Sequence, residues 1–225
     1  MVSQLKNQLQ LNNPLNVVYN GNFKWDAAPK QRDEASASTY YRIEEGYRGY
    51  DTGSDHRPNG GSWTSALCPR NIKLEACREC LNNTIPYLNK SCPKQREGVA
   101  WTALPKVTYI VRYSDSSFRG RFDAWAWTTF SSPLNQTPAS AIDLEKGLNT
   151  LADKLKRPAA GGGMLQMFAS GAIAYGPGPR GSWPLYGYMQ CTPDIRKEDC
   201  MKCLTDATNA IHNCCSKGRK LAAIV

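Results

Sequence analysis

Nine cysteines are the residues whose spacing points most directly to chemistry. They lie at positions 68, 77, 80, 92, 191, 200, 203, 214 and 215. Four of them recur 123 residues later: Cys68, Cys77, Cys80 and Cys92 correspond to Cys191, Cys200, Cys203 and Cys215. Each copy contains the pattern C-x8-C-x2-C. Four matches at one offset indicate an internal repeat, so the sequence predicts two tandem domains.

Cysteines at this spacing serve three known chemistries. Zinc takes four ligands in two close pairs, and a four-cysteine site remains an open alternative. A redox pair needs its C-x-x-C at the start of a helix, whereas Cys77 and Cys80 fall further inside the predicted helix. We favour structural disulfides, because a bridge that closes a loop of ~15 residues contributes ~3 kcal/mol and persists outside the cytosol. Since nine is odd, at least one thiol stays unpaired or bonds to another chain.

Apolar periodicity predicts the elements that position the cysteines. In each copy, apolar residues recur at steps of three and four, from Leu74 to Leu88 and from Cys200 to Ile211, which is typical of one helix face. Asn71 and Asp194 are the expected N-caps. The segments 62–67 and 185–190 precede Cys68 and Cys191 and are rich in aromatic and hydroxyl residues, which favours strands.

Further segments complete the prediction. Residues 107–113 favour a strand, and residues 142–156 favour a helix capped by Ser140 and ended by Pro158 and the glycines 161–163. Residues 131–138 are predicted to be a linker or loop between the copies. Helices and strands in this order indicate an α+β fold, with helices laid on an antiparallel sheet in each domain.

The charge balance does not favour nucleic acid. The net charge is +9, but residues 1–120 carry 16 basic against 11 acidic residues and residues 121–225 carry 12 against 8. A phosphate-binding surface normally shows a clustered basic stripe. No apolar run approaches the ~18 residues that span a bilayer, and the start of the chain is too polar for a signal peptide. We expect no nucleic-acid partner and no transmembrane segment in this chain.

Candidate catalytic groups are few. The two histidines, His56 and His212, are not repeated between the copies, and no Ser/His/Asp or Cys/His set is evident. Glu44 and Glu45 are adjacent, so in an extended segment they face opposite sides. We therefore expect no enzyme activity, no cofactor and no metal. Three sequons, at Asn82, Asn89 and Asn135, predict N-glycosylation and so passage through the secretory pathway.

Together these motifs resemble the plant ginkbilobin-homologous family, also called stress-antifungal. The resemblance rests on the tandem C-x8-C-x2-C pattern, on the segment from Arg112 to Phe118 and on the segment from Gln190 to Asp194. It covers residues 15–225. The family includes cysteine-rich repeat secretory proteins and the ectodomains of cysteine-rich receptor-like kinases. It implies two helices on an antiparallel sheet in each domain, and bridges Cys68–Cys77 and Cys191–Cys200.

The chain departs from the family pattern in both copies. A typical domain has six cysteines, but copy one has none near Val18–Gly21 and carries Tyr109 at the late-strand position. The usual partners of Cys80 and Cys92 are therefore missing, and we hypothesise that these two pair with each other. The partners of Cys203, Cys214 and Cys215 are left open. Copy two lacks the last strand, which would lie at 230–236.

The resulting domain prediction is an extension over 1–14, a degenerate domain over 15–120 and a domain over 121–225 without its last strand. The resemblance implies a secreted or cell-surface interaction module of plant stress or defence responses, acting on a protein partner. The alternative is a mannose-type lectin with antifungal activity that binds cell-wall or fungal glycans. For that sugar site Asn20 is a loose match, Ser114 occupies the place of a glutamate, and no arginine matches.

Overall fold

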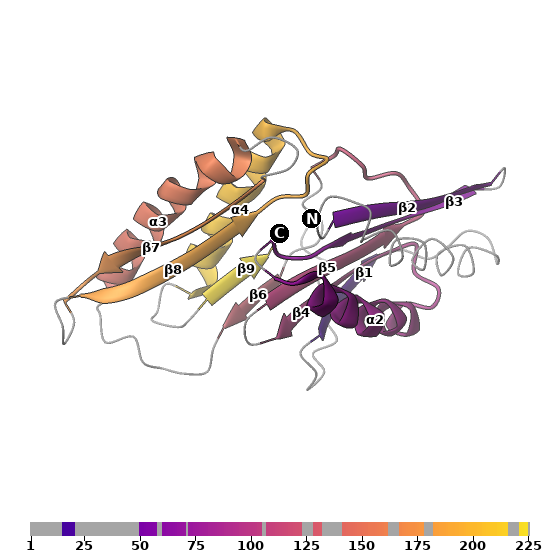
Figure 1. Cartoon of the computed structure of the whole chain (residues 1–225), viewed down its shortest axis with the longest axis horizontal. Coiled ribbons are helices and arrows are strands. Elements are labelled where there is room, and N and C mark those ends of the chain that lie inside the picture. The colour runs from indigo at the N-terminus through magenta and orange to yellow at the C-terminus, as the bar shows by residue number, and fades with distance from the viewer. Residues whose placement is uncertain are drawn as a thin grey trace. The chain divides into compact units, whose positions relative to one another are not determined.

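The computed structural model describes ten stretches of the chain: residues 15–20, 50–57, 60–70, 72–104, 107–122, 128–131, 141–161, 167–177, 182–215 and 221–224. The chain divides into two compact units, Met1–Arg119 and Gly120–Val225. Each unit has its own helix or helices and its own antiparallel strands (Figure 1).

Unit 1 is built on a five-stranded antiparallel sheet. Its strands are β1 (Leu15–Asn20), β2 (Tyr50–Arg57), β3 (Gly60–Leu67), β4 (Glu97–Leu104) and β5 (Val107–Ser114). Their order across the sheet is β1-β4-β5-β3-β2, so the last strand in sequence is the central one. Strand β5 pairs with β4 on one side and with β3 on the other.

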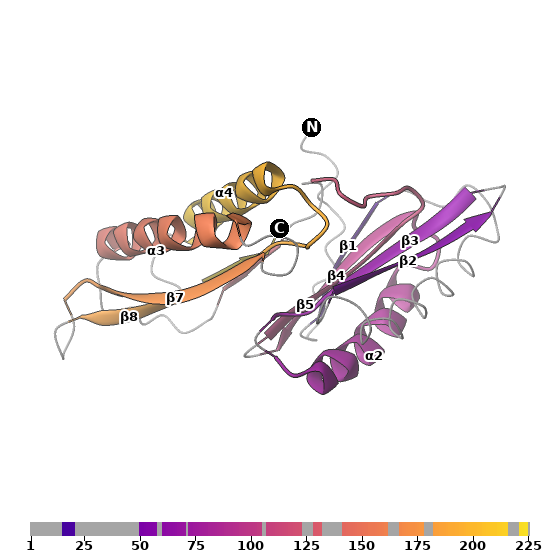
Figure 2. The same ribbon diagram turned by 45° about the horizontal axis from the view of Figure 1, so that its top comes forward.

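Helix α2 (Leu74–Ser91) packs along one face of this sheet (Figure 2). Its apolar stripe is fully buried against alternate residues of the strands. The core consists of Ala66, Cys68, Cys77, Cys80, Leu81, Ile85, Leu88, Cys92, Ala100, Tyr109, Val111 and Tyr113. The helix periodicity predicted from the sequence therefore marks the buried face.

Unit 2 has the same kinds of elements in the order β6 (Thr128–Ser131), α3 (Ala141–Gly161), β7 (Phe168–Tyr175), β8 (Trp183–Gln190), α4 (Lys197–Cys215) and β9 (Leu221–Ile224). Its described strands form two antiparallel pairs, β7 with β8 and β6 with β9. Helices α3 and α4 lie along one face of the β7–β8 pair (Figures 1 and 2). Between them lies a core centred on Leu151, Leu155, Met167, Cys200 and Leu204.

The predicted α+β fold of helices on antiparallel sheets is confirmed. The repeat offset relates β3 to β8 and α2 to α4. Adding 123 to the bounds of β3 gives 183–190, the bounds of β8. Adding it to the start of α2 gives Lys197, where α4 begins. The described residues of unit 1 contain one helix, α2. Residues 21–33 lie outside the described part of the chain.

Helix boundaries differ from the prediction in three places. Helix α2 has Lys73 as its N-cap residue, without a side-chain cap bond, and Asn71 lies outside the described residues. Asp194 precedes α4 by three residues, and its Oδ2 accepts a hydrogen bond from the backbone N–H of Gly120 instead of capping the helix. Helix α3 continues through Pro158 to Gly161. Ala159 and Ala160 there are buried in the core of unit 2, and this packing offsets the backbone hydrogen bond that proline cannot donate.

The linker prediction over 131–138 is also wrong at its start. Ser131 is the last residue of β6, which pairs with β9 inside unit 2. The boundary between the units lies earlier, between Arg119 and Gly120. Ser140 and residues 132–139 lie outside the described residues.

Candidate functional site

Equivalent disulfides join a strand to the following helix in both units. In unit 1, Cys68 follows β3 directly and is bonded to Cys77 in the first turn of α2, with a Cα–Cα distance of 5.9 Å. In unit 2, Cys191 follows β8 and is bonded to Cys200 at the start of α4, again with 5.9 Å between the Cα atoms. Both bridges are at least nine-tenths buried. Each fixes the angle at which a helix leaves the sheet.

The remaining cysteines lie in or next to the two helices. Cys80 and Cys92 are buried in unit 1, and the Sγ of Cys80 lies 3.7 Å from the Oγ1 of Thr84. The pairing of Cys80 with Cys92 stays a prediction. Burial, with a smaller contribution from Asp206, raises the pKa of the Cys203 thiol to about 11. Cys214 and Cys215 end α4, and their side chains lie outside the described ones.

The bridges bear on the zinc alternative. Zinc binds cysteine as thiolate, and the first cysteine of each C-x-x-C pair, Cys77 or Cys200, is bonded to another sulfur. Among the described residues, no cluster of three or more His, Cys, Asp or Glu side chains is placed to hold a metal ion. Cys68–Cys77 and Cys191–Cys200 have the arrangement of structural disulfides that join a strand to a helix.

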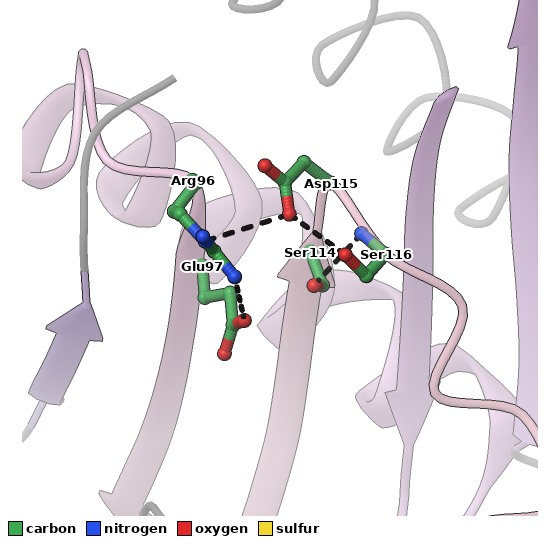
Figure 3. A network of polar contacts seen from close by, with 5 residues as sticks. All are labelled: Arg96, Glu97, Ser114, Asp115 and Ser116. Atoms are coloured by element: carbon green, nitrogen blue, oxygen red, sulfur yellow. Dashed lines mark hydrogen bonds and ion pairs between the residues drawn. The ribbon is translucent and has the colours of Figure 1, made fainter. Parts of the chain in front are cut away.

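A polar network lies at the shared end of β4 and β5 (Figure 3). The guanidinium of Arg96 contacts two carboxylates: Nη2 lies 3.5 Å from Oε1 of Glu97, and Nε lies 3.6 Å from Oδ1 of Asp115. The hydroxyl of Ser116 donates to the same Asp115 oxygen at 3.1 Å. The backbone N–H of Ser116 donates to the Oγ of Ser114. The two carboxylates are largely buried, whereas the arginine is about one-third exposed.

Sequence reasoning missed this network because Asp115 lies 18 residues after Glu97 and meets Arg96 only in the folded sheet. Strand register brings them together. Asn20 of β1 pairs with Glu97, Glu97 pairs with Ser114, and Ser114 pairs with Trp63 of β3. We call these four residues the cross-strand row. Asn20 and Ser114, the two positions compared with the family's sugar site, thus share one row with a carboxylate and an indole.

The β7–β8 pair presents an exposed aromatic face. Odd-numbered residues of both strands face α3 and α4, and even-numbered residues face the other way. Tyr186 is 76% exposed and Tyr188 is 37% exposed. Phe168 stacks on Tyr188 with 6.1 Å between ring centroids. We define the aromatic face as Phe168, Pro184, Tyr186 and Tyr188. It lies opposite the helix-covered side of the pair.

Neither histidine lies in a described catalytic set. Nε2 of His212 lies 2.9 Å from Oδ1 of Asn149, so this pair joins α4 to α3. His56 belongs to β2, opposite Gly61. Trp101 is fully buried, and Trp63 and Trp183 are half-buried. Trp125 and Trp127 lie outside the described residues.

Two of the three sequons lie on α2. Asn82 is exposed, while Asn89 is half-buried, and Asn135 lies outside the described residues. Thr84 of the first sequon is fully buried, and its hydroxyl donates to the carbonyl oxygen of Cys80 at 2.8 Å. The described helices include none with the length and hydropathy needed to cross a membrane.

Comparison with known proteins bears on these features. Residues 132–225 match the family model described as salt stress response/antifungal. Those residues include the second C-x8-C-x2-C copy with its bridge. The second copy of the repeat is thus similar to the salt stress response/antifungal family. The resemblance expected from the cysteine pattern is therefore confirmed.

Relatives of the chain include receptor-like kinases and a cysteine-rich repeat secretory protein. It is 29% identical over 171 residues to cysteine-rich receptor-like protein kinase 29 of Arabidopsis thaliana, covering 76% of this chain and 24% of the kinase. It is 28% identical over 150 residues to cysteine-rich repeat secretory protein 38 of the same plant, covering 67% of this chain and 55% of that protein. The chain thus spans about a quarter of the kinase and about half of the secretory protein.

A solved structure shares the fold. The tandem DUF26 ectodomain of the Arabidopsis thaliana cysteine-rich receptor-like protein PDLP8 matches with a TM-score of 0.66 and 16% identity. The match covers 92% of this chain and 94% of that one. The chain therefore shares the fold of this tandem ectodomain.

Proposed function

We propose that the chain is a non-enzymatic extracellular interaction module that binds a protein partner in plant stress or defence signalling. Its fold is that of a tandem ectodomain, and its relatives include secretory proteins and receptor-like kinases. Buried bridges such as Cys68–Cys77 and Cys191–Cys200 persist in oxidising compartments, which supports a location in the apoplast or at the cell surface.

The aromatic face of β7–β8 is the observation that carries a protein-binding role. Interfaces are enriched in tyrosine, which offers a large apolar ring and a polar hydroxyl at low cost in conformational entropy. Tyr186 leaves three-quarters of its surface in water, and alanine residues across β7 at positions 172 and 174 leave its ring accessible. A flat strand face of this composition is suited to a protein surface. Because the nine cysteines cannot all pair within one chain, a remaining thiol offers a disulfide to another chain as a second mode of association.

Glycan binding is the second candidate, and the cross-strand row favours it. Sugar sites combine carboxylate or amide acceptors for hydroxyl groups with an aromatic ring that stacks on the pyranose face. The row places Glu97 between Asn20 and Ser114, and Trp63 lies next along it. The arginine beside the row, Arg96, is engaged by both Glu97 and Asp115, so a sugar would compete with these ion pairs.

The two candidates are separated by one binding experiment on the secreted chain. The chain is tested against purified plant ectodomains and against a glycan array that includes mannans. We expect a protein partner whose binding falls at least tenfold on Tyr186→Ala with Tyr188→Ala. The matched control is Ile142→Ala, which removes an apolar residue of α3 that is 64% exposed. Mannan-competed binding that is lost on Glu97→Gln, and unaffected by the tyrosine variant, would overturn the proposal in favour of the lectin.

A further inference from the structure

The side of the β7–β8 pair that carries the aromatic face is uncharged. Its eight residues are the even-numbered ones from Phe168 to Ala174 and from Pro184 to Gln190, and they include no Asp, Glu, Lys, Arg or His. Six of the eight are exposed, although 21% of the chain's residues are charged. A charge on the covering segment would lose water and find no counter-charge here. The segment that fits this side is therefore uncharged.

The three rings of the aromatic face follow one another along the strands. Tyr186 and Tyr188 are two residues apart on β8, which separates them by ~7 Å. Phe168 pairs with Gln190, the next residue of β8 on this side, and its ring centroid lies 6.1 Å from that of Tyr188. Opposite Tyr186 is the small Ala172, and the tyrosine is 76% exposed. The rings together match the length of ~4 residues of a polyproline II helix, which rises ~3.1 Å per residue.

The polar groups on this side favour a ligand that accepts hydrogen bonds. The hydroxyl of Tyr188 donates to Oε1 of Gln190, so the amide acceptor on this side is already engaged. The exposed hydroxyls of Ser170 and Tyr186 can donate, and no carboxylate is present to accept. A sugar needs acceptors for its many hydroxyl groups. A proline-rich segment offers carbonyl oxygens and has no N–H at its prolines, so it needs donors instead.

The outer edge of β7 disfavours binding by strand addition. Pro184 has no N–H, so its pair with Ala174 is a non-hydrogen-bonded pair, and so is the pair of Ala172 with Tyr186 two residues away. The carbonyl group of Ala172 therefore points away from β8, and its oxygen accepts a hydrogen bond from Nζ of Lys154 at 3.4 Å. A lysine at a strand edge opposes pairing with another strand. A strand beside β7 or β8 would also extend the sheet in its plane and leave the aromatic face open.

We propose that the aromatic face binds an uncharged, proline-rich segment of the partner protein in the polyproline II conformation. The inference rests on the proposed protein-binding function and names the chemistry of the segment bound. Its prolyl rings pack on Phe168, Tyr186 and Tyr188, and one of its carbonyl oxygens accepts a hydrogen bond from the Tyr186 hydroxyl. This conformation is already formed in the free segment and has no internal hydrogen bonds, so little conformational entropy is lost on binding.

The probe is labelled decaproline, added to the full secreted chain. The control peptide is a decamer of alternating glycine and serine with the same label, which is uncharged but does not hold the polyproline II conformation. We expect saturable binding of decaproline, at least tenfold tighter than that of the control. It should weaken at least tenfold on Tyr186→Ala with Tyr188→Ala and stay unchanged on Ile142→Ala. If the double variant does not fold, Tyr186→Ala alone decides, because that side chain is largely exposed.

A further variant separates the ring from its hydroxyl. Tyr186→Phe keeps the ring and removes the donor, so decaproline should bind several-fold more weakly to it and weakest of all to Tyr186→Ala. Equal binding of the two peptides, or decaproline binding that the tyrosine variants leave unchanged, would overturn the proposal. If purified plant ectodomains bind through the tyrosines while decaproline does not, this inference fails and the proposed function stands. Mannan-competed binding that is lost on the tyrosine variants would assign the aromatic face to a polysaccharide and overturn both.

Discussion

The backbone N–H of Gly120 donates a hydrogen bond to Oδ2 of Asp194, 2.8 Å away and 74 residues later in the sequence. Gly120 has φ of +67°, a conformation that residues with a Cβ rarely adopt. Two cation–π contacts, one on each side of Gly120, also hold the segment 118–122. Arg112 lies 4.3 Å from the ring centroid of Phe118, and Lys202 lies 5.3 Å from that of Phe122.

Removing the Asp194 carboxylate should therefore loosen this segment. Arg119 and Arg121 flank Gly120, and both are exposed to trypsin. We expect Asp194→Ala to be cleaved at these arginines several times faster than the parent chain, with a loss of about 1 kcal/mol in unfolding free energy. The control is Asp206→Ala, on the exposed side of α4. Equal cleavage of both variants would show that the bond to Gly120 does not hold the segment.

Gly98 should be intolerant of any side chain. A Cβ at this position would lie 2.6 Å from Cε1 of Tyr113 and 2.9 Å from its Cζ. The ring cannot swing away, because Tyr113 is fully buried and its hydroxyl is bonded to the carbonyl of Cys92. We expect Gly98→Ala to lower the unfolding free energy by about 1–3 kcal/mol in urea denaturation. Gly161→Ala meets no atom within 4 Å and should be neutral or stabilising.

The stability of unit 1 should fall at high pH because of Tyr109. Burial, followed by the charges of Cys80 and Glu79, raises the pKa of this tyrosine above its ordinary value. Above pH ~10 the unfolded chain releases the phenol proton while the folded chain retains it, so stability falls as the pH rises. Tyr109→Phe lacks this effect and also lacks the hydrogen bond to Ala76, worth about 1 kcal/mol.

The expected result is a pH-dependent difference between the two proteins. Near pH 7 the Tyr109→Phe variant should be the less stable one in urea, and the difference should shrink above pH 10. Tyr186→Phe, at a site exposed to water, serves as the control and should show no such change. A difference that stays constant between pH 7 and pH 10.5 would contradict the assignment of the pKa shift to Tyr109.

Asn82 should carry a glycan when the chain is made in a secretory pathway. The asparagine is exposed on α2, but the Thr84 hydroxyl of its sequon is buried and bonded to the carbonyl of Cys80. The glycan must therefore be attached before α2 folds. We expect Asn82→Gln to remove one step of the glycosidase-sensitive mass shift. Asn83→Gln, which leaves the sequon intact at the adjacent exposed residue, should keep that step; the same loss in both variants would contradict the site.

The 123-residue spacing between equivalent cysteines predicted much of the fold, because it gives the positions of a strand and of the following helix together. It located α4 from α2 and β8 from β3, since a disulfide between strand end and helix start requires both elements. Strand β9 was not predicted, because four residues are too few to show a pattern of alternation. The cross-strand row was missed because it depends on the register among β1, β4, β5 and β3, which local spacing does not encode.

Helix ends were predicted less well than helix faces. Asp194 has the short acidic side chain that favours an N-cap, but a tertiary partner, the N–H of Gly120, takes its oxygen. Pro158 normally ends a helix, yet buried Ala159 and Ala160 carry α3 past it. In both cases a contact with residues distant in sequence outweighs a local preference.

The central claim is that, in each of the two repeated units, a disulfide formed outside the cytosol joins the end of a strand to the start of the next helix. A disulfide map of the secreted chain tests this claim most directly. The protein is alkylated without reductant, digested and analysed by mass spectrometry. We expect linked peptides joining Cys68 to Cys77 and Cys191 to Cys200. Alkylation of all four of these cysteines in folded protein would contradict the account and favour a thiolate or metal site instead.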